Sequence, residues 1–204
     1  MHLNLSDLSA NQAYHTLTQT LIPRPVAWVL SDSGNDSLNL APFSYFNAVC
    51  SDPPLVMISI GKKPDGSQKD TCCNIEERRD FIIHIASIDQ LDTLNQSSLT
   101  LPHGDSELKL VDVELDQIEG SRLPIISGSP IAYICNHHDT QEIDNSGQKL
   151  IFGEVMAVHI DDRVCTQDDA GRLKIIAKKV NPLLRLGAGE YGTLGEVIAR
   201  KRPA

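Results

Sequence analysis

The sequence is organised around one stretch, residues 38–57, which reads LNLAPFSYFNAVCSDPPLVM. It opens with alternating small and apolar residues, turns at Asp52-Pro53-Pro54, and continues into an apolar run over residues 55–60 that predicts a buried strand. Between these parts a serine, a tyrosine, a phenylalanine and an asparagine follow one another at residues 44–47. An ordinary core strand would not collect such a run. It is typical of a wall that stacks on a flat ligand and forms hydrogen bonds to the ligand's edge.

Length and charge restrict the class of protein. A chain of 204 residues can bury a good core as one unit, particularly as a β-barrel, so we expect a single domain over residues 1–204. The formal net charge of −9 argues against a nucleic-acid or anionic-membrane partner, because both require a basic face. No apolar stretch approaches the roughly 20 residues of a membrane span, and the N-terminus has no signal pattern. We therefore expect a cytoplasmic protein.

The five cysteines stand at positions 50, 72, 73, 135 and 165 and form no CxxC pair. Neighbouring cysteines such as Cys72 and Cys73 do not readily chelate one metal ion or form an unstrained disulfide. Free thiols in a reducing compartment are therefore expected. His137 and His138 lack a third ligand at metal spacing, so no metal site is predicted.

The N-terminal quarter of the chain predicts a helix followed by a hairpin. Apolar residues recur at helical spacing over residues 7–22, with Ser9 available as a cap, and Pro23 and Pro25 end that helix. Residues 26–30 (VAWVL) predict the first strand, and SDSGNDS at 31–37 predicts a turn. This strand and the opening part of residues 38–57 should form a β-hairpin with a polar tip.

A second informative segment follows the buried strand at residues 55–60. A loop over residues 61–71 leads into a short helix at 72–79, with Asp70 or Thr71 as the expected N-cap. Helix N-termini bind phosphate readily, and Ser67, Thr71 and Lys69 would add two hydroxyl donors and a positive charge. The alternative is a solvated basic turn before a capped helix.

The second half of the chain predicts further strands and helices. FIIHIA at 81–86 reads as a strand in which His84 is more typical of a core histidine than of a ligand. The glycine inside the strand at 150–160 predicts a bulge or a close backbone approach. GAGEYG near the C-terminus is a poor dinucleotide fingerprint, and a segment that places Tyr191 against another surface is preferred. The other expected segments are a helix at 88–99, a possible strand at 108–115, a strand at 131–137 and a disordered tail at about 199–204.

The fold class predicted from these segments is mainly β: a β-barrel of five or six strands with three short peripheral helices. No GxSxG, HExxH or P-loop motif occurs, and the paired carboxylates lie in turn-like sequence, so no catalytic residue is assigned. A protein without catalytic groups of its own, but with an aromatic wall and a phosphate loop, is expected to bind a cofactor that carries the chemistry.

Several ordered blocks of the sequence resemble the flavin reductase-like family of FMN-binding split barrels. They are PRPVAWV (23–29), NLAPFSYFNAVCSDPP (39–54), GSQKDTCCNI (66–75), GEVMAVHID (153–161) and PLLRLGAGEY (182–191). The segment that ends in SDPP, with the loop that follows it, is the most specific part. The resemblance implies an antiparallel Greek-key split barrel that forms a homodimer, with FMN held near the subunit interface.

The resemblance also implies a set of cofactor-binding residues. Four residues of the wall would line the ribityl chain and the edge of the ring, the next two would contact the ring, and the loop would hold the phosphate. Arg24 would lie near the ring or the phosphate, and Tyr191 would cover the flavin. Cys50 departs from the serine common at its position. The full set is Arg24, Ser44, Tyr45, Phe46, Asn47, Cys50, Ser51, Ser67, Lys69, Thr71 and Tyr191.

The implied activity is that of an FMN-dependent NAD(P)H oxidoreductase of the flavin reductase type. NADH or NADPH would be the co-substrate, delivering hydride to the flavin N5. The electrons would then pass to a small-molecule acceptor or to a monooxygenase partner. One alternative is an FMN-binding electron carrier without NAD(P)H activity of its own, because no nicotinamide motif is identifiable in the sequence. Another is a split barrel that has lost flavin and binds a different ligand.

Overall fold

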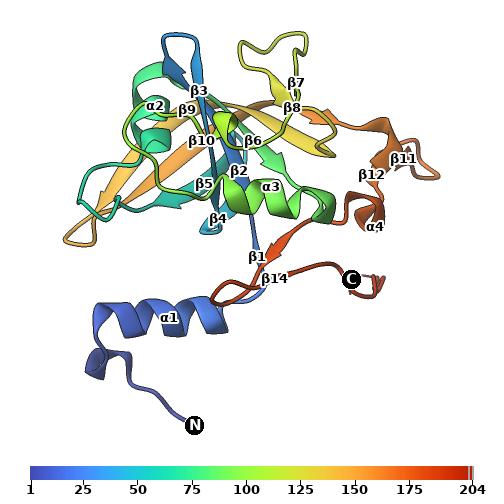
Figure 1. Ribbon diagram of the computed structural model, residues 1–204. Helices are drawn as coiled ribbons and strands as arrows, with labels where there is room; N and C mark the ends of the chain where they lie inside the picture. The colour runs from blue at the N-terminus through green and yellow to red at the C-terminus, as the bar shows by residue number, and fades with distance from the viewer. Residues whose placement is uncertain (202, 204) are drawn as a thin grey trace.

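The computed structural model describes residues 1–201 and residue 203. Its main feature is an antiparallel seven-stranded sheet with the order β3-β2-β6-β9-β10-β5-β4 (Figure 1). In chain order its strands are β2 (Ala27–Gly34), β3 (Ser37–Phe43), β4 (Phe46–Ser51), β5 (Pro54–Ile60), β6 (Asp80–Ile85), β9 (Ile131–Ile143) and β10 (Gln148–Ile160). The described residues contain no helix that is long and apolar enough to cross a membrane.

The two edge strands of this sheet, β3 and β4, are consecutive in sequence and are separated only by Ser44 and Tyr45. The backbone N–H of Ser59 on β5 donates to the carbonyl of Tyr45 at 2.8 Å, which holds this bend against the sheet. The sheet therefore curls until its edges meet at the bend, which gives an open barrel. The residues of the predicted ligand wall stand at this closure.

The hairpin predicted from the sequence is confirmed in β2 and β3. The strands pair in the register Ala27↔Phe43 to Asp32↔Leu38, and a bulge follows at the tip. Gly34, Asn35 and Asp36 at the tip all have positive φ, between 51° and 78°. Such angles favour Gly, Asn and Asp, which explains why the SDSGNDS segment forms a turn.

The central strands β2 and β6 are buried on both faces, which explains their uninterrupted apolar sequences. Along β2, Ala27 and Val29 belong to a core inside the barrel, whereas Trp28 and Leu30 belong to a second core on the outer face. This alternation follows the period of two residues of a strand. The inner core includes Phe43, Ile58, Phe81 and Ile151; the outer core includes Leu40, Ile82, Leu94 and Ile126.

Helix α2 (Asp70–Arg78) packs on the inner core through Cys72 and Ile75. The side-chain amide of Asn74 donates to the hydroxyls of Ser31 and Ser33 at 3.1 and 3.0 Å, which fixes the helix against β2. The sequence placed the N-cap of this helix at Asp70 or Thr71. That prediction is wrong by one or two residues: the N-cap is Lys69, and no side chain caps the helix.

His84 is confirmed as a core histidine. The residue has no exposed surface, and its Nε2 accepts a hydrogen bond from the backbone N–H of Ile126 at 3.0 Å. With Nε2 accepting, Nδ1 carries the proton and donates to the carbonyl of Trp28 at 3.1 Å. Both ring nitrogens are therefore satisfied by the backbone.

The strand expected over residues 108–115 is wrong. A 3-10 turn occupies Glu107–Lys109, and only the short pair β7 (Leu115–Asp116) and β8 (Ile125–Ile126) follows. The apolar alternation that suggested a strand instead supplies Val111 and Val113 to the outer core. The helix expected at residues 88–99 is shorter, with a 3-10 turn at Ile88–Gln90 leading into α3 (Leu91–Gln96).

The strand predicted at residues 131–137 continues to Ile143 and pairs with β10 in a long hairpin. Its outer half, residues 138–143, is polar and mostly exposed, so no apolar pattern indicated it. The count of five or six strands is likewise too low, because several strands have only two or three residues. These are β1 (Arg24–Pro25), β7, β8, β11 (Cys165–Gln167), β12 (Leu173–Ile175), β13 (Leu184–Arg185) and β14 (Tyr191–Gly192).

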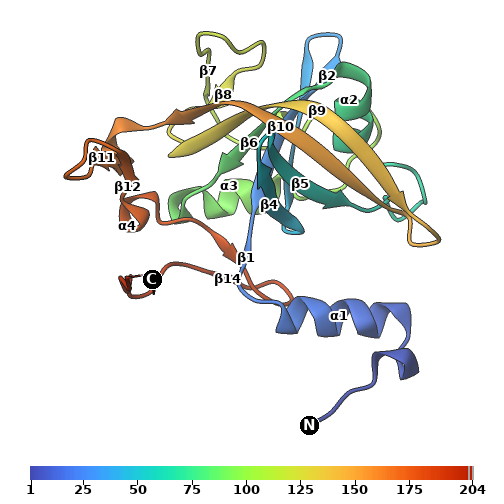
Figure 2. The ribbon, with the colours of Figure 1, turned by 180° about the vertical axis from the view of Figure 1, so that it is seen from behind.

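The N-terminal helix α1 (Ala10–Thr20) lies beneath the barrel, next to the small sheet β1-β13-β14 (Figures 1 and 2). Ser9 caps it as predicted, in a reciprocal pair with Gln12. The short helix α4 (Ala177–Val180) precedes β13. Residues 193–201 form no regular structure. The disordered tail expected at 199–204 includes residues 202 and 204, which lie outside the described residues.

Candidate functional site

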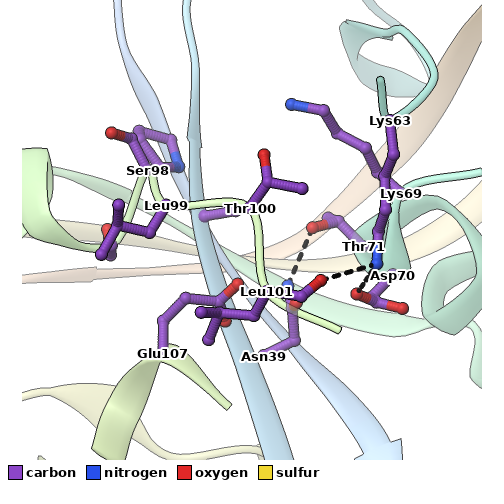
Figure 3. A pocket seen from close by; sticks show the side chains of 13 residues that line it. Asn39, Lys63, Lys69, Asp70, Thr71, Ser98, Leu99, Thr100, Leu101 and Glu107 are labelled. Atoms are coloured by element: carbon purple, nitrogen blue, oxygen red, sulfur yellow. Dashed lines mark hydrogen bonds and ion pairs between the residues drawn. The ribbon is translucent and has the colours of Figure 1, made fainter. Parts of the chain in front are cut away.

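A polar cavity lies between β3, the N-terminus of α2 and the loop that follows α3 (Figure 3). It has a volume of about 40 Å³, the space of roughly three water molecules if each needs about 10–15 Å³. This is suited to a small anionic group. The residues that line it include Asn39, Lys63, Lys69, Asp70, Thr71, Glu107 and the loop residues 97–101.

Lys69 is the cation of this cavity that has no ion pair or hydrogen bond among the described residues. Its ammonium group stands 5.4 Å from the centre of the Phe43 ring, in a cation–π contact. Burial, followed by the repulsion of the nearby Lys63, lowers the pKa of Lys69, and the charge of Glu107 opposes that shift. A partly desolvated ammonium of this kind attracts an anion more strongly than an exposed one.

Lys63 is neutralised by its neighbours. Its Nζ pairs with Asp70 Oδ2 at 2.7 Å, with both side chains 8% exposed, and donates to the carbonyl of Leu101 at 3.2 Å. His103 contacts the other carboxylate oxygen of Asp70. Figure 3 shows Lys63 reaching to Asp70, whereas Lys69 extends away from that pair. Of the two lysines that line the cavity, Lys63 is therefore paired with Asp70, and Lys69 is available to a ligand.

Two further contacts fix the wall formed by β3. The side-chain amide of Asn39 donates to Thr71 Oγ1 at 2.8 Å, and both residues are buried. The carboxylate of Glu107 accepts a hydrogen bond from the backbone N–H of Leu40 at 3.0 Å, and burial raises the pKa of that carboxyl group. No side chain caps α2, and the N–H of Cys72 already donates to the carbonyl of Lys69 at 2.9 Å, so the amides of Asp70 and Thr71 are the first-turn donors that an anion could use.

An apolar groove of about 670 Å³ lies on the opposite side of the bend at Ser44 and Tyr45. Strands β4, β5, β9 and β10 form one side of it, and the segment from Ile175 to Leu184 forms the other. No Asp, Glu, Lys or Arg lines it. Four of the residues predicted to contact the flavin lie here, namely Phe46, Asn47, Cys50 and Ser51.

The two cavities lie close together along the chain. Pro42 lines the polar cavity and Phe46 lines the apolar groove. Four residues of fully extended chain span at most about 14 Å, so these two residues are no farther apart than that. The polar cavity and the apolar groove are therefore within reach of one elongated ligand.

Arg24 makes structural contacts. Its guanidinium is buried and donates to the carbonyls of Thr18, Leu21 and Leu186 at 2.8, 2.6 and 2.9 Å. Its Nε also approaches Ser44 Oγ at 3.5 Å. Arg24 therefore fastens α1 and the C-terminal segment to the bend between β3 and β4.

The structure brings Lys69 and Thr71 together but leaves Ser67 outside the polar cavity. The Ser67 hydroxyl is exposed and donates to the Asp65 carboxylate at 2.6 Å. Tyr191 lies at the end of the small sheet, with the Arg185 guanidinium 4.5 Å from its ring centre. Its hydroxyl is 3.5 Å from the Asn95 side chain on α3, the helix that leads into the cavity loop.

Sequence reasoning did not single out Asn39, Lys63, Asp70, Glu107 or the loop after α3 as parts of the site. Asn39 lies inside the NLAPF block, so it could have been found from that block. Lys63 follows Lys62 in the sequence, and nothing in the sequence shows that the side chain of Lys63, and not that of Lys62, reaches the cavity. The loop and Glu107 are distant in sequence and carry no recognisable signal.

The architecture is a mainly β open barrel with peripheral helices, and its candidate site combines a polar cavity that contains Lys69 with an apolar groove. A family model described as the flavin reductase like domain matches residues 19–181. The chain therefore belongs to the flavin reductase-like family. The predicted antiparallel Greek-key split barrel with peripheral helices is confirmed.

Relatives match nearly the whole chain. An uncharacterized protein of Halalkalibacterium halodurans is 32% identical over 207 residues, covering 100% of this chain and 97% of that protein. Among solved structures, nitrilotriacetate monooxygenase component B from Bacillus cereus has a TM-score of 0.87 and 30% identity, with 98% of each chain covered. The 2-nitrobenzoate 2-nitroreductase of Pseudomonas fluorescens also has a TM-score of 0.87, with 26% identity and coverage of 100% of this chain and 96% of that chain.

Proposed function

We propose that this protein is an FMN-dependent NAD(P)H oxidoreductase of the flavin reductase type. The observation that carries the proposal is the position of Lys69, which has no ion pair among the described residues and stands beside Thr71 at an uncapped helix N-terminus. A cation, a hydroxyl and free backbone amides are the donors that a phosphate group needs. Membership of the flavin reductase-like family supports FMN as the source of that phosphate.

The residues around the bend would share the work of holding the cofactor. Lys69 and Thr71 would bind the phosphate, and Phe46, Asn47, Cys50 and Ser51 would contact the ring and its edge, with Ser44 and Tyr45 at the ribityl chain. When bound, FMN would supply the hydride and electron-transfer chemistry between NADH or NADPH and an acceptor. The protein would contribute alignment of the two rings and exclusion of water rather than a proton-transfer residue of its own.

The acceptor is proposed from the named relatives. The similarity to a monooxygenase component supports a role in which reduced flavin serves an oxygenase partner. The similarity to a nitroreductase supports direct reduction of a small aromatic acceptor. We also propose a homodimer with FMN near the subunit interface, because the uncharged groove beside Phe46 and Asn47 is an apolar surface open to solvent.

The first experiment is a visible absorption spectrum of the purified protein with FMN, before and after anaerobic addition of NADH or NADPH. A flavin spectrum that bleaches with either nucleotide is the expected result. A bound flavin that stays oxidised with both nucleotides would overturn the NAD(P)H activity and leave an electron carrier that a partner reduces. If added FMN does not bind, the whole proposal fails.

A further inference from the structure

Helix α1 has an unusual surface for a helix that lies outside the barrel. None of its eleven residues is Asp, Glu, Lys or Arg, although 22% of the chain is charged. Thr18 is its only buried residue. Tyr14, Leu17 and the C-cap Leu21 are 55%, 46% and 63% exposed and recur at helical spacing, so they form one apolar stripe. We call these three residues the α1 stripe.

The protein's own chain fixes the direction of α1. Arg24 holds the carbonyls of Thr18 and Leu21, at the C-terminal end of the helix, together with the carbonyl of Leu186. Gln19 packs so closely on Gly187 that a Cβ at that glycine would overlap the Gln19 side chain. Figures 1 and 2 show α1 beneath the barrel in both views. With its C-terminal end held in this way, α1 keeps its stripe exposed instead of turning it into its own groove.

The apolar groove has the same character as the α1 stripe. It is lined without a single Asp, Glu, Lys or Arg, and it contains exposed or partly exposed residues of β4 and β10 such as Phe46, Cys50 and Val158. The α1 stripe offers three apolar side chains, and the groove offers about 670 Å³ lined by uncharged residues that could receive them. The α1 stripe and the apolar groove are both uncharged and are not covered by the described residues. Burying them against each other would remove apolar surface from water.

We propose that two copies of this chain exchange their N-terminal helices, so that the α1 stripe of each copy lies in the apolar groove of the other. In a dimer with twofold symmetry each copy supplies one stripe and one groove, so both stripes and both grooves are covered. A foreign partner would have to match both surfaces separately. The inference rests on the homodimer proposed above. It adds that the partner's α1 covers the wall formed by Phe46 and Asn47, so the site is complete only in the dimer.

Cys50 provides a direct test, because it is exposed and lies in the groove. In a background with Cys73→Ser and Cys165→Ser, one copy would carry Leu17→Cys together with Cys50→Ser. The other copy would keep Cys50 and a native helix, and would carry an affinity tag. After coexpression in full length, a short bismaleimide should join unlike copies into a product with the sum of their two masses. Tyr14→Cys and Leu21→Cys test the same stripe.

The matched control places the cysteine on the same helix outside the stripe. His15 is an exposed position that is not three or four residues from Tyr14, Leu17 or Leu21, so it lies on another face of the helix. The variant His15→Cys should give less than a tenth of the product obtained from the best stripe position. Equal cross-linking from His15 and from the stripe, or none from the stripe in a protein that is a dimer by light scattering, would overturn the exchange.

Charge provides a second measurement that does not depend on cross-linking. The pair Tyr14→Glu and Leu17→Glu should shift the sedimentation coefficient from that of a dimer to that of a monomer, whereas the pair Gln12→Glu and His15→Glu, at exposed positions outside the stripe, should not. A dimer that survives the first pair would overturn the exchange and leave the homodimer standing. A wild-type monomer would overturn both. A dimer that fails to bind FMN would overturn only the proposed flavin function.

Discussion

Asn39 on β3 donates its side-chain amide to the hydroxyl of Thr71 on α2 at 2.8 Å, in a setting where both residues are buried. This bond joins the two sequence segments that carry the proposed site, residues 38–57 and the N-terminus of α2. The strand that leads into the proposed flavin wall is thus connected directly to the corner that would hold the phosphate.

Thr71→Val tests this connection. Valine has nearly the same shape but cannot accept the bond, so the buried amide of Asn39 loses its partner. We expect the free energy of unfolding to fall by about 1–3 kcal/mol, the usual cost of an unsatisfied buried donor. Urea unfolding followed by the fluorescence of Trp28 measures it. Thr100→Val, at an exposed position on the rim of the same cavity, is the control and should change stability by less than about 0.5 kcal/mol.

Lys69→Ala tests the proposed phosphate contact. If the ammonium makes a charge-assisted hydrogen bond to the phosphate, its loss should weaken FMN binding by about 1.5–3 kcal/mol. Titration with FMN followed by flavin fluorescence gives the dissociation constant. Lys62→Ala is the matched control, since Lys62 belongs to the same loop but does not line the polar cavity. An affinity that is equal in the two variants would refute the assignment.

His84 should make the fold sensitive to mild acid. Burial lowers the pKa of this histidine to about 4, from an ordinary value of 6.5. The folded state therefore binds the proton less well than the unfolded state. The contribution of neutral His84 to the free energy of unfolding is fully present above pH 6.5. It decreases by up to about 1.4 kcal/mol per pH unit as the pH falls toward 4, where the loss levels off.

Urea unfolding between pH 7.5 and pH 4.5 separates this contribution from that of the carboxylates. His84→Gln removes the titrating group, so its stability should decrease less steeply with falling pH than that of the wild type. His15→Gln, at an exposed position on α1, should keep the wild-type slope. Parallel curves for the wild type and His84→Gln would show that His84 does not control acid stability.

The parts of the fold that the sequence could predict are those where burial follows a regular period. The apolar runs of β2, β5 and β6 are continuous because these strands pack on both faces or inside the barrel, and the turn at Gly34 requires positive φ. The outer half of β9 was missed because an exposed hairpin needs no apolar residues. The two-residue strands were missed because two residues show no period.

The candidate site was predictable only where its residues are neighbours in sequence. Lys69 and Thr71 lie at one loop-to-helix junction, and their spacing indicated an anion site, with a solvated basic turn as the alternative. The identification of the anion as the phosphate of FMN came from the family resemblance. Glu107 and the loop after α3 enter the site through tertiary packing and have no local sequence signal. The Ser67 hydroxyl instead bonds to Asp65 two residues earlier, a local turn contact that competes with a role in the cavity.

Gly153 on β10 was predicted to mark a bulge or a close backbone approach. The structure has the bulge, and the close neighbour of this glycine is the side chain of Phe81. The β9–β10 register shifts between Phe152 and Gly153. A Cβ added at Gly153 would overlap Cζ of Phe81 and lie 3.2 and 3.3 Å from two other atoms of that ring. Phe81 is 1% exposed and is packed within the inner core. Gly153→Ala should therefore lower the free energy of unfolding by about 1–3 kcal/mol, the usual cost of overpacking.

The double variant Gly153→Ala with Phe81→Leu identifies the cause. The shorter leucine makes room for the new methyl group, so the double variant should be more stable than the sum of the two single losses implies, with a coupling of about 0.5–3 kcal/mol. Gly189→Ala is the control, because no atom lies within 4 Å of the added Cβ. Losses that simply add, or a loss at Gly153 no larger than that at Gly189, would show that contact with Phe81 does not explain the glycine.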